Sequence, residues 1–302
     1  MSQSRDQVPR FDADMDRRYR AALARARSDR SVVGVDVGFV YDRHGTTTGA
    51  IDVRVHRRAS GVASPVVTIS SSHQPAPRSA MNRDYSSSVR PGARIANLDR
   101  SVGTLGLVVY DERTNERLIM SSAHVLGTPQ SSRDELVHLV PAGTERPHAL
   151  ARCSRAVNSV IGDAAVAEPL AEVEIDVAQR NGTIIVHAAF PQLGDIVEKI
   201  GAATGRTCGV VDGLGHYFLS GDTDGMLGFR IVRGVPNGTR DIAQAGDSGA
   251  AWYRLEDHVG VGLHVGGDQS IEDESLQPAI ACYLPVVLDA LAVTLLPNDQ
   301  RR

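Results

Sequence analysis

The chain opens with the pattern of one helix followed by two strands. In residues 12–27, apolar side chains recur at steps of three and four, and acidic residues precede arginines as the helix dipole favours. Residues 32–39 and 51–56 each alternate apolar and polar positions and flank a turn rich in Gly and Thr. These patterns predict a helix and a small β extension ahead of the main body.

The rest of the chain predicts many short strands. Residues 64–97 are rich in Ser, Pro and Arg, which indicates a linker or long surface loop. Beyond them, short apolar runs alternate with turn signals, including an expected hairpin of residues 171–180 and 183–190 joined by Asn-Gly. A closing helix is expected over residues 285–295. The pattern predicts an all-β barrel or sandwich, with an extension at 1–63, a linker at 64–97 and the main domain at 98–302.

Composition narrows the class of protein. With 302 residues there is room for one large or two small domains, and a net charge of −4 argues against nucleic acid as a partner. No apolar run approaches the length of a bilayer span, and the first twenty residues lack the apolar stretch of a secretory signal, so we expect a cytoplasmic protein without a membrane partner. The cysteines are odd in number and far apart, which predicts reduced thiols and no metal site: Cys153, Cys208 and Cys282.

A glycine-flanked serine is the first candidate for chemistry. In Gly246-Asp247-Ser248-Gly249, Gly246 permits a tight turn that points amide groups inward, and Asp247 can anchor that turn. The string is a candidate nucleophile loop with its own oxyanion hole. A polar β-turn without chemistry is the alternative from these residues alone.

A serine nucleophile needs a base and an orienting carboxylate. His124 follows an expected strand and stands beside small residues that leave room for its imidazole, although a histidine can equally lie on the surface or in a satisfied core. Asp163 lies in a small apolar run, where a buried carboxylate requires a partner. The order along the chain is His124, Asp163, Ser248.

At this point the sequence resembles the trypsin/chymotrypsin-like serine proteases. The resemblance covers about residues 101–297 and rests on the segments A-H-V, D-A-A-V-A, GAATGRTCG, A-G-D-S-G and GLHVGG. Finer cues, such as VDVGFVY and RPGARI, resemble a cytosolic bacterial branch related to the plant narrow-leaf protein, whose members carry a small N-terminal extension. The chain departs from that branch at Ser122 and Ala123, where an asparagine pair is common, and it lacks the disulfides of secreted relatives.

The resemblance implies an all-β fold of two six-stranded antiparallel β-barrels, with the N-terminal extension and a C-terminal helix added. It implies a serine endopeptidase that needs no cofactor and acts on protein or peptide substrates through an acyl-enzyme. Ser248 would be the nucleophile, His124 the general base and Asp163 its orienting acid. The backbone amides of Gly246 and Ser248 would form the oxyanion hole, and residues 265–267 would pair with substrate backbone: Val265, Gly266 and Gly267.

The sequence leaves two alternatives for the substrate specificity. His264 projects from the strand before the paired glycines, and a histidine there would favour Glu or Gln before the cleaved bond. It could instead merely pack. Across the expected pocket, Ile242 and Ala243 have no side-chain hydrogen-bonding groups for a Glu or Gln substrate, while Asp241 could attract a basic side chain.

Three alternatives of function also stay open. The fold could serve as a binding scaffold with weak or no catalysis, the protease could cut only its own linker, or it could await an activating cleavage. For the N-terminal extension we expect a role in regulation or homo-oligomerisation.

Overall fold

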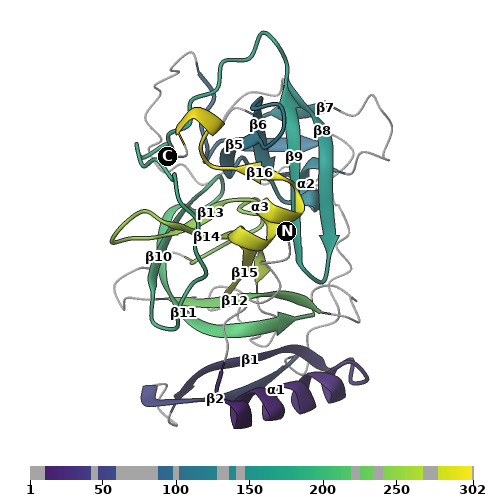
Figure 1. Cartoon of the computed structure of the whole chain (residues 1–302), viewed down its shortest axis with the longest axis vertical. Coiled ribbons are helices and arrows are strands. Elements are labelled where there is room, and N and C mark those ends of the chain that lie inside the picture. Colours follow the sequence, from purple (N-terminus) through teal and green to yellow (C-terminus); the bar gives the residue numbers. More distant parts are fainter. Residues whose placement is uncertain are drawn as a thin grey trace.

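The computed structural model describes residues 11–41, 47–58, 88–97, 102–127, 136–140, 147–218, 225–233, 241–267 and 278–300. Most of the expected linker, residues 64–87, lies outside these ranges. The described chain forms two antiparallel sheets of eight strands each, together with three short or medium helices (Figure 1). No helix in these ranges has the length and apolar character that a membrane span requires.

The first sheet has the order β16-β5-β6-β9-β8-β7-β3-β4 and is curled but open. Its strands are β3 (Arg94–Asn97), β4 (Val102–Thr104), β5 (Leu107–Asp111), β6 (Arg117–Ser121), β7 (Leu136–Leu139), β8 (His148–Ser159), β9 (Gly162–Pro169) and β16 (Val293–Thr294). The one-turn helix α2 (Ala123–Leu126) follows β6 directly. Strand β3 occupies the last four residues of the expected linker, because its apolar side chains are buried in this sheet.

The second sheet closes into a six-stranded barrel and then continues outward. The barrel strands are β10 (Ile196–Gly201), β11 (Gly205–Tyr217), β12 (Met226–Arg233), β13 (Ala251–Arg254), β14 (Gly260–Gly267) and β15 (Ala279–Tyr283). Pairing of β10 with β11 closes the barrel, and it uses only residues 205–210 of the long strand β11. Residues 213–217 of β11 instead pair with β1 (Val32–Tyr41), which pairs with β2 (Thr47–Arg57). The N-terminal strands thus extend the barrel sheet itself.

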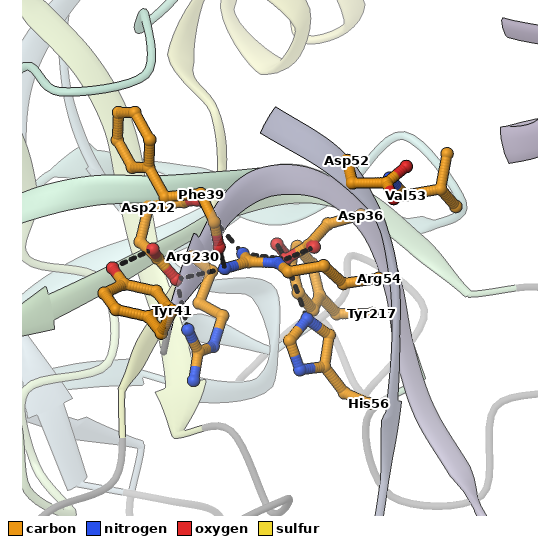
Figure 2. A network of polar contacts seen from close by, with 10 residues as sticks. All are labelled: Asp36, Phe39, Tyr41, Asp52, Val53, Arg54, His56, Asp212, Tyr217 and Arg230. Carbon is orange, nitrogen blue, oxygen red and sulfur yellow. Dashed lines mark hydrogen bonds and ion pairs between the residues drawn. The ribbon is translucent and has the colours of Figure 1, made fainter. Parts of the chain in front are cut away.

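A buried polar network joins this extension to the barrel (Figure 2). Asp36 of β1 accepts hydrogen bonds from Arg54 at 2.7 and 2.9 Å, from Tyr217 at 2.9 Å, and lies 2.9 Å from a ring nitrogen of His56. The second carboxylate, Asp212 of β11, contacts Arg54 at 3.0 Å. Two further partners of Asp212 are Arg230 of β12 and Tyr41 of β1.

Both carboxylates of the network are fully buried, and it is assembled from four neighbouring strands. Glycine makes room for it, because a Cβ at Gly213 would collide with Asp36 and Arg54. The burial of Asp36 would raise its pKa, but the His56 and Arg54 partners outweigh this and hold the pKa well below the usual range. The carboxylate is therefore charged throughout the neutral range.

Helix α1 (Ala13–Ala26) confirms the predicted N-terminal helix and packs on the extension. The Asp12 carboxylate caps it by accepting from the amides of residues 14 and 15 at 3.0 and 2.8 Å. Its apolar stripe covers Val35 and Val53 of the two N-terminal strands. Tyr19 Oη also lies 2.5 Å from His216 Nδ1 of β11, so the helix contacts the barrel sheet directly.

Two local predictions were wrong. Residues 171–190 form no hairpin. Asn181–Gly182 makes a turn, but the segments on its two sides do not pair as strands. Each forms one isolated β-bridge with a different part of the chain, Ile175 with Val89 and Ala188 with Gly260. This stretch connects the two sheets, so its first segment packs against the first sheet and its second segment against the barrel. The closing helix α3 (Leu284–Ala290) ends before residue 295, because the chain turns at Ala292, with φ of 50°, into β16.

Candidate active site

The base and the acid of the expected triad come from the first sheet. One-turn helix α2 presents His124, and Asp163 is the second residue of β9. The Asp163 carboxylate contacts the ring Nδ1 of His124 through one oxygen and accepts from the backbone amide of His124 at 3.1 Å through the other. Two bonds to one residue fix both the position and the orientation of the imidazole.

The electrostatics of this pair favour a charged imidazole. Burial lowers the pKa of His124, but the hydrogen bond that the imidazole donates to Asp163 and the negative charge of Asp163 outweigh burial, so the net pKa lies above the ordinary value. Asp163 is buried at 7% exposure, whereas the His124 side chain is 34% exposed. This arrangement stabilises the imidazolium that a general base becomes after it takes a proton.

The serine comes from the second sheet, on the loop between β12 and β13. Gly246 and Gly249 have φ of 103° and 90°, in the left-handed region that favours glycine. A Cβ at Gly249 would also collide with Ser121, three residues before His124. Glycine at this position therefore lets the loop of the barrel approach the end of β6.

Thr104 of β4 fastens this loop to the first sheet. Its backbone amide donates to the carbonyl of Ser248 at 2.8 Å, and its hydroxyl donates to the carbonyl of Gly246 at 2.8 Å. The hydroxyl of Ser122 donates to the carbonyl of His264 at 3.1 Å. The two sheets thus meet at the segments that carry the three expected catalytic residues.

The Ser248 hydroxyl donates to the carbonyl of Val265 at 3.4 Å. Within the part of the chain that the structure describes, no hydrogen bond joins Ser248 to His124. Such bonds are often long or poorly aligned without substrate and tighten when it binds.

Asp247 anchors the serine loop through a buried ion pair. Its carboxylate accepts from Lys199 Nζ at 2.8 Å, and neither side chain is exposed to solvent. Thr204 donates to the carboxylate through its hydroxyl at 2.6 Å and its amide at 3.1 Å, and two more amides donate at 2.9 and 3.1 Å: Ala203 and Gln244. Burial would raise the pKa of Asp247, but the charge of Lys199 and these bonds hold it below the ordinary value.

Lys199 is the residue that sequence reasoning missed. It is the one lysine among 32 basic residues, and it lies on β10 with its ammonium 5.4 Å from the ring centre of Trp252. Its being the single lysine in an arginine-rich chain was the one signal that the sequence offered, and that signal does not show that the residue is buried or paired.

The expected specificity residues divide into buried and accessible ones. His264 is 2% exposed and faces the edge of Trp252, and Ile242 is also buried. Burial, and then the charge of Lys199, lower the pKa of His264 to about 3, so its imidazole is neutral at pH 7. Its Nδ1 is buried and has no hydrogen-bond partner among the described residues. Ala243 is half-buried and packs beside the barrel core.

Residues 265–267 form a partly exposed strand end. Strand β13 pairs with β14 only over residues 260–263, whereas β15 pairs with it up to Gly267. The far side of residues 265–267 is therefore unpaired within the described structure, on the side where β13 has ended. Val265, Gly266 and Gly267 are half-buried. Among the residues described, no cluster of His, Cys, Asp or Glu side chains is arranged to hold a metal ion.

Comparison with known proteins identifies the fold. No protein-family model matches the chain, and no curated protein gives a significant match. Among solved structures, a glutamic-acid-specific serine protease that uses a histidine triad in substrate binding is 19% identical, with a TM-score of 0.51, covering 68% of this chain and 99% of its own. A Nocardiopsis protease and protease A of Thermobifida fusca are each 15% identical, with a TM-score of 0.49; the matches cover 68% and 70% of this chain and 98% and 100% of theirs. The chain has the double-β-barrel fold of the trypsin/chymotrypsin-like serine proteases.

Proposed function

We propose that the protein is a serine endopeptidase. Ser248 attacks the scissile carbonyl, His124 takes its proton and later gives it to the leaving amine, and Asp163 holds the imidazole in the required tautomer. The observation that carries the proposal is the doubly bonded His124–Asp163 pair, which the two-sheet contact brings to the serine loop.

The amides of Gly246 and Ser248 would stabilise the tetrahedral oxyanion, at about 3–4 kcal/mol for each donor. The Lys199–Asp247 pair supports this role, because it holds the loop between the two amides from within the barrel. It also argues against an activating cleavage, since the loop is anchored by a side chain of the intact chain. The unpaired side of residues 265–267 would accept the substrate backbone as an added strand.

A fluorophosphonate probe tests the proposal. The folded wild type should be labelled on Ser248, found by peptide mass mapping, and should cleave a casein or peptide substrate. Ser248→Ala should lose both, while Ser154→Ala, a serine half-buried in β8 away from the loop, should keep both. Folded wild type that neither reacts nor cleaves would favour the alternative of a binding scaffold. Labelling together with one cut in its own chain, seen by intact mass, would favour self-processing.

We also propose a preference for Glu or Gln before the cleaved bond, read by His264, whose Nδ1 is buried without a partner among the described residues and would have to become accessible when substrate binds. Since the imidazole is neutral, recognition would use a hydrogen bond, and a Gln substrate should be accepted as well as a Glu substrate. A peptide library varied at that position measures this. A preference for Arg would reject it and point to Asp241. We place the reaction in the cytosol, as the free thiols of the three cysteines suggest.

A further inference from the structure

Strand β2 is the outer edge of the eight-stranded sheet. It is eleven residues long, and in the described structure no strand pairs with its outer side. Natural edge strands are commonly protected from pairing by proline, by bulges and by charged side chains, above all lysine. Strand β2 has no proline or lysine. Of its charged side chains, Arg54 bonds into the buried network, and Asp52 and Arg57 are held in ion pairs with Arg18 and Asp29.

The apolar face of this edge is exposed. Ile51 and Val55 are 43% and 45% exposed, and they alternate with Val53 on the face that carries α1. At the end of neighbouring strand β1, Tyr41 is 40% exposed. Three of the seven large hydrophobic side chains found exposed in the described ranges thus belong to this two-stranded extension.

Helix α1 overhangs the same edge. It packs on both β1 and β2 (Figure 1). Tyr19 and Leu23 lie in the same apolar cluster as Val32 and Val35 of β1 and Val53 of β2. A groove of about 450 Å³ remains between the helix and β2. Its apolar floor includes Ala22, Val53 and Val55, and its rim includes Arg18, Arg25 and Arg57. Residues of both the helix and β2 therefore line a groove that the described chain leaves open.

The dimensions fit a second copy of this same unit. Paired strands lie about 4.8 Å apart. If two β2 strands pair across a two-fold axis, helices centred between β1 and β2 in each copy would lie about 10 Å apart, which matches the usual 8–10 Å between packed helices. The small side chains of Ala21 and Ala22 permit that approach.

Sequence symmetry and charge fit as well. Antiparallel pairing centred on Val53 places Ile51 opposite Val55 of the second copy, beneath the two helices. The two-fold axis also reverses the helix direction, so the acidic first turn of one α1, with Asp14, faces the basic last turn of the other, with Arg25. Opposite charges then meet at both ends of the helix pair, and the rim arginines Arg18 and Arg57 are already paired within each copy, with Asp52 and Asp29.

We propose that two copies of the protein pair through β2 and α1, joining their sheets into one continuous sheet under an antiparallel pair of helices. The interface is isologous, so both edges are closed at once. It lies on the two strands outside the closed barrel and does not depend on whether Ser248 is catalytic.

Light scattering and sedimentation velocity on the full chain test the proposal. The wild type should have twice the chain mass of 32.2 kDa. Ile51→Lys should weaken dimerisation at least about tenfold, or about 1.4 kcal/mol. The matched control, Ile196→Lys, changes an isoleucine that is 55% exposed on β10 and should leave the dimer intact.

A charge exchange keeps the test valid if a strand variant misfolds. Asp14→Arg and Arg25→Asp alone should each weaken the dimer, because each creates two like-charge contacts, and the double variant should restore it. Hydrogen exchange should show β2 amides protected in the dimer. A wild type that is monomeric at its highest soluble concentration overturns the proposal, as does a dimer unaffected by both Ile51→Lys and the charge exchange. A monomer with protected β2 amides also overturns it, because another segment of the same chain would then be covering the β2 edge.

Discussion

The Lys199–Asp247 pair shows how much one buried residue can decide. Both side chains are sealed from solvent, so loss of either partner leaves an uncompensated charge in the barrel interior. Burial also lowers the pKa of the Lys199 ammonium, although Asp247 opposes this. Each charge is therefore stabilised only while its partner is present, and Asp247 is the residue directly before the proposed nucleophile, Ser248.

We predict that Lys199→Met lowers the free energy of unfolding by about 3–5 kcal/mol, because Asp247 is left buried and unpaired. At a temperature where the variant is folded, kcat should fall more than KM changes, since the loop rather than the substrate cleft is disturbed. Chemical denaturation and peptide hydrolysis measure the two effects. Lys199→Arg retains the charge and should recover part of the stability. Unchanged kcat in folded Lys199→Met would show that the pair does not position the loop.

The raised pKa of His124 predicts the pH dependence of activity. The general base must be neutral, so activity should rise with pH through a pKa above the 6.5 of free histidine. In Asp163→Asn the raising partner is lost and burial remains, so this acid limb should move to lower pH while kcat falls by about four orders of magnitude. Rate profiles of both proteins measure this. An acid limb that stays in place would show that Asp163 does not set the His124 pKa.

The three expected catalytic residues could be predicted because each lies in a short local motif, and their geometry follows from the sheets that carry them. Lys199 could not be predicted in the same way. Its role depends on burial and on a partner 48 positions away, which local pattern does not report. The sequence likewise suggested that His264 faces a pocket, whereas the structure buries it beside Trp252.

At the scale of elements, Arg54 links β2 to β1 and β11, because it bonds to the buried carboxylates of both Asp36 and Asp212. We predict that Arg54→Ala lowers the free energy of unfolding by about 3–5 kcal/mol, because Asp36 and Asp212 each lose a charged partner. A matched variant in the same strand, Arg57→Ala, removes a 59% exposed arginine whose ion pair with Asp29 is worth about 0–1 kcal/mol. Denaturant titration compares them. Equal losses would mean that the network contributes no more than a surface pair.

Helices and strands were predicted correctly where the hydrophobic period of the sequence matches the face that the structure buries. Helix α1 and strand β2 each pack one face, so their periods survive in the sequence. Strand β1 is buried on both faces over residues 32–38, and its apolar residues still alternate with Gly34, Asp36 and Gly38. The stretch at 171–190 failed because its alternating apolar residues pack against two different sheets as the chain crosses between them. Period alone does not distinguish a paired strand from an extended connection.

For the whole molecule, the sequence predicted a separate N-terminal extension, but the structure continues the barrel sheet into it. We predict that a chain lacking residues 1–58 aggregates or melts at lower temperature than the wild type. Removal of β1 and β2 would expose the 213–217 edge of β11 and leave Asp212 without Arg54 and Tyr41. Light scattering and thermal unfolding measure this. A monodisperse truncated chain with unchanged melting would show that the barrel is complete without its extension.

Strand β11 also limits how this architecture can be reused in engineering. One half of it closes the barrel and the other half carries the extension, with an irregularity in its β12 register between Val211 and Gly213. A graft of the first sixty residues onto another double-barrel scaffold would therefore fail unless it also brought the distal half of this strand, with Gly213 and Asp212. The transferable unit is discontinuous in the chain, and domain-shuffling at the linker would not capture it.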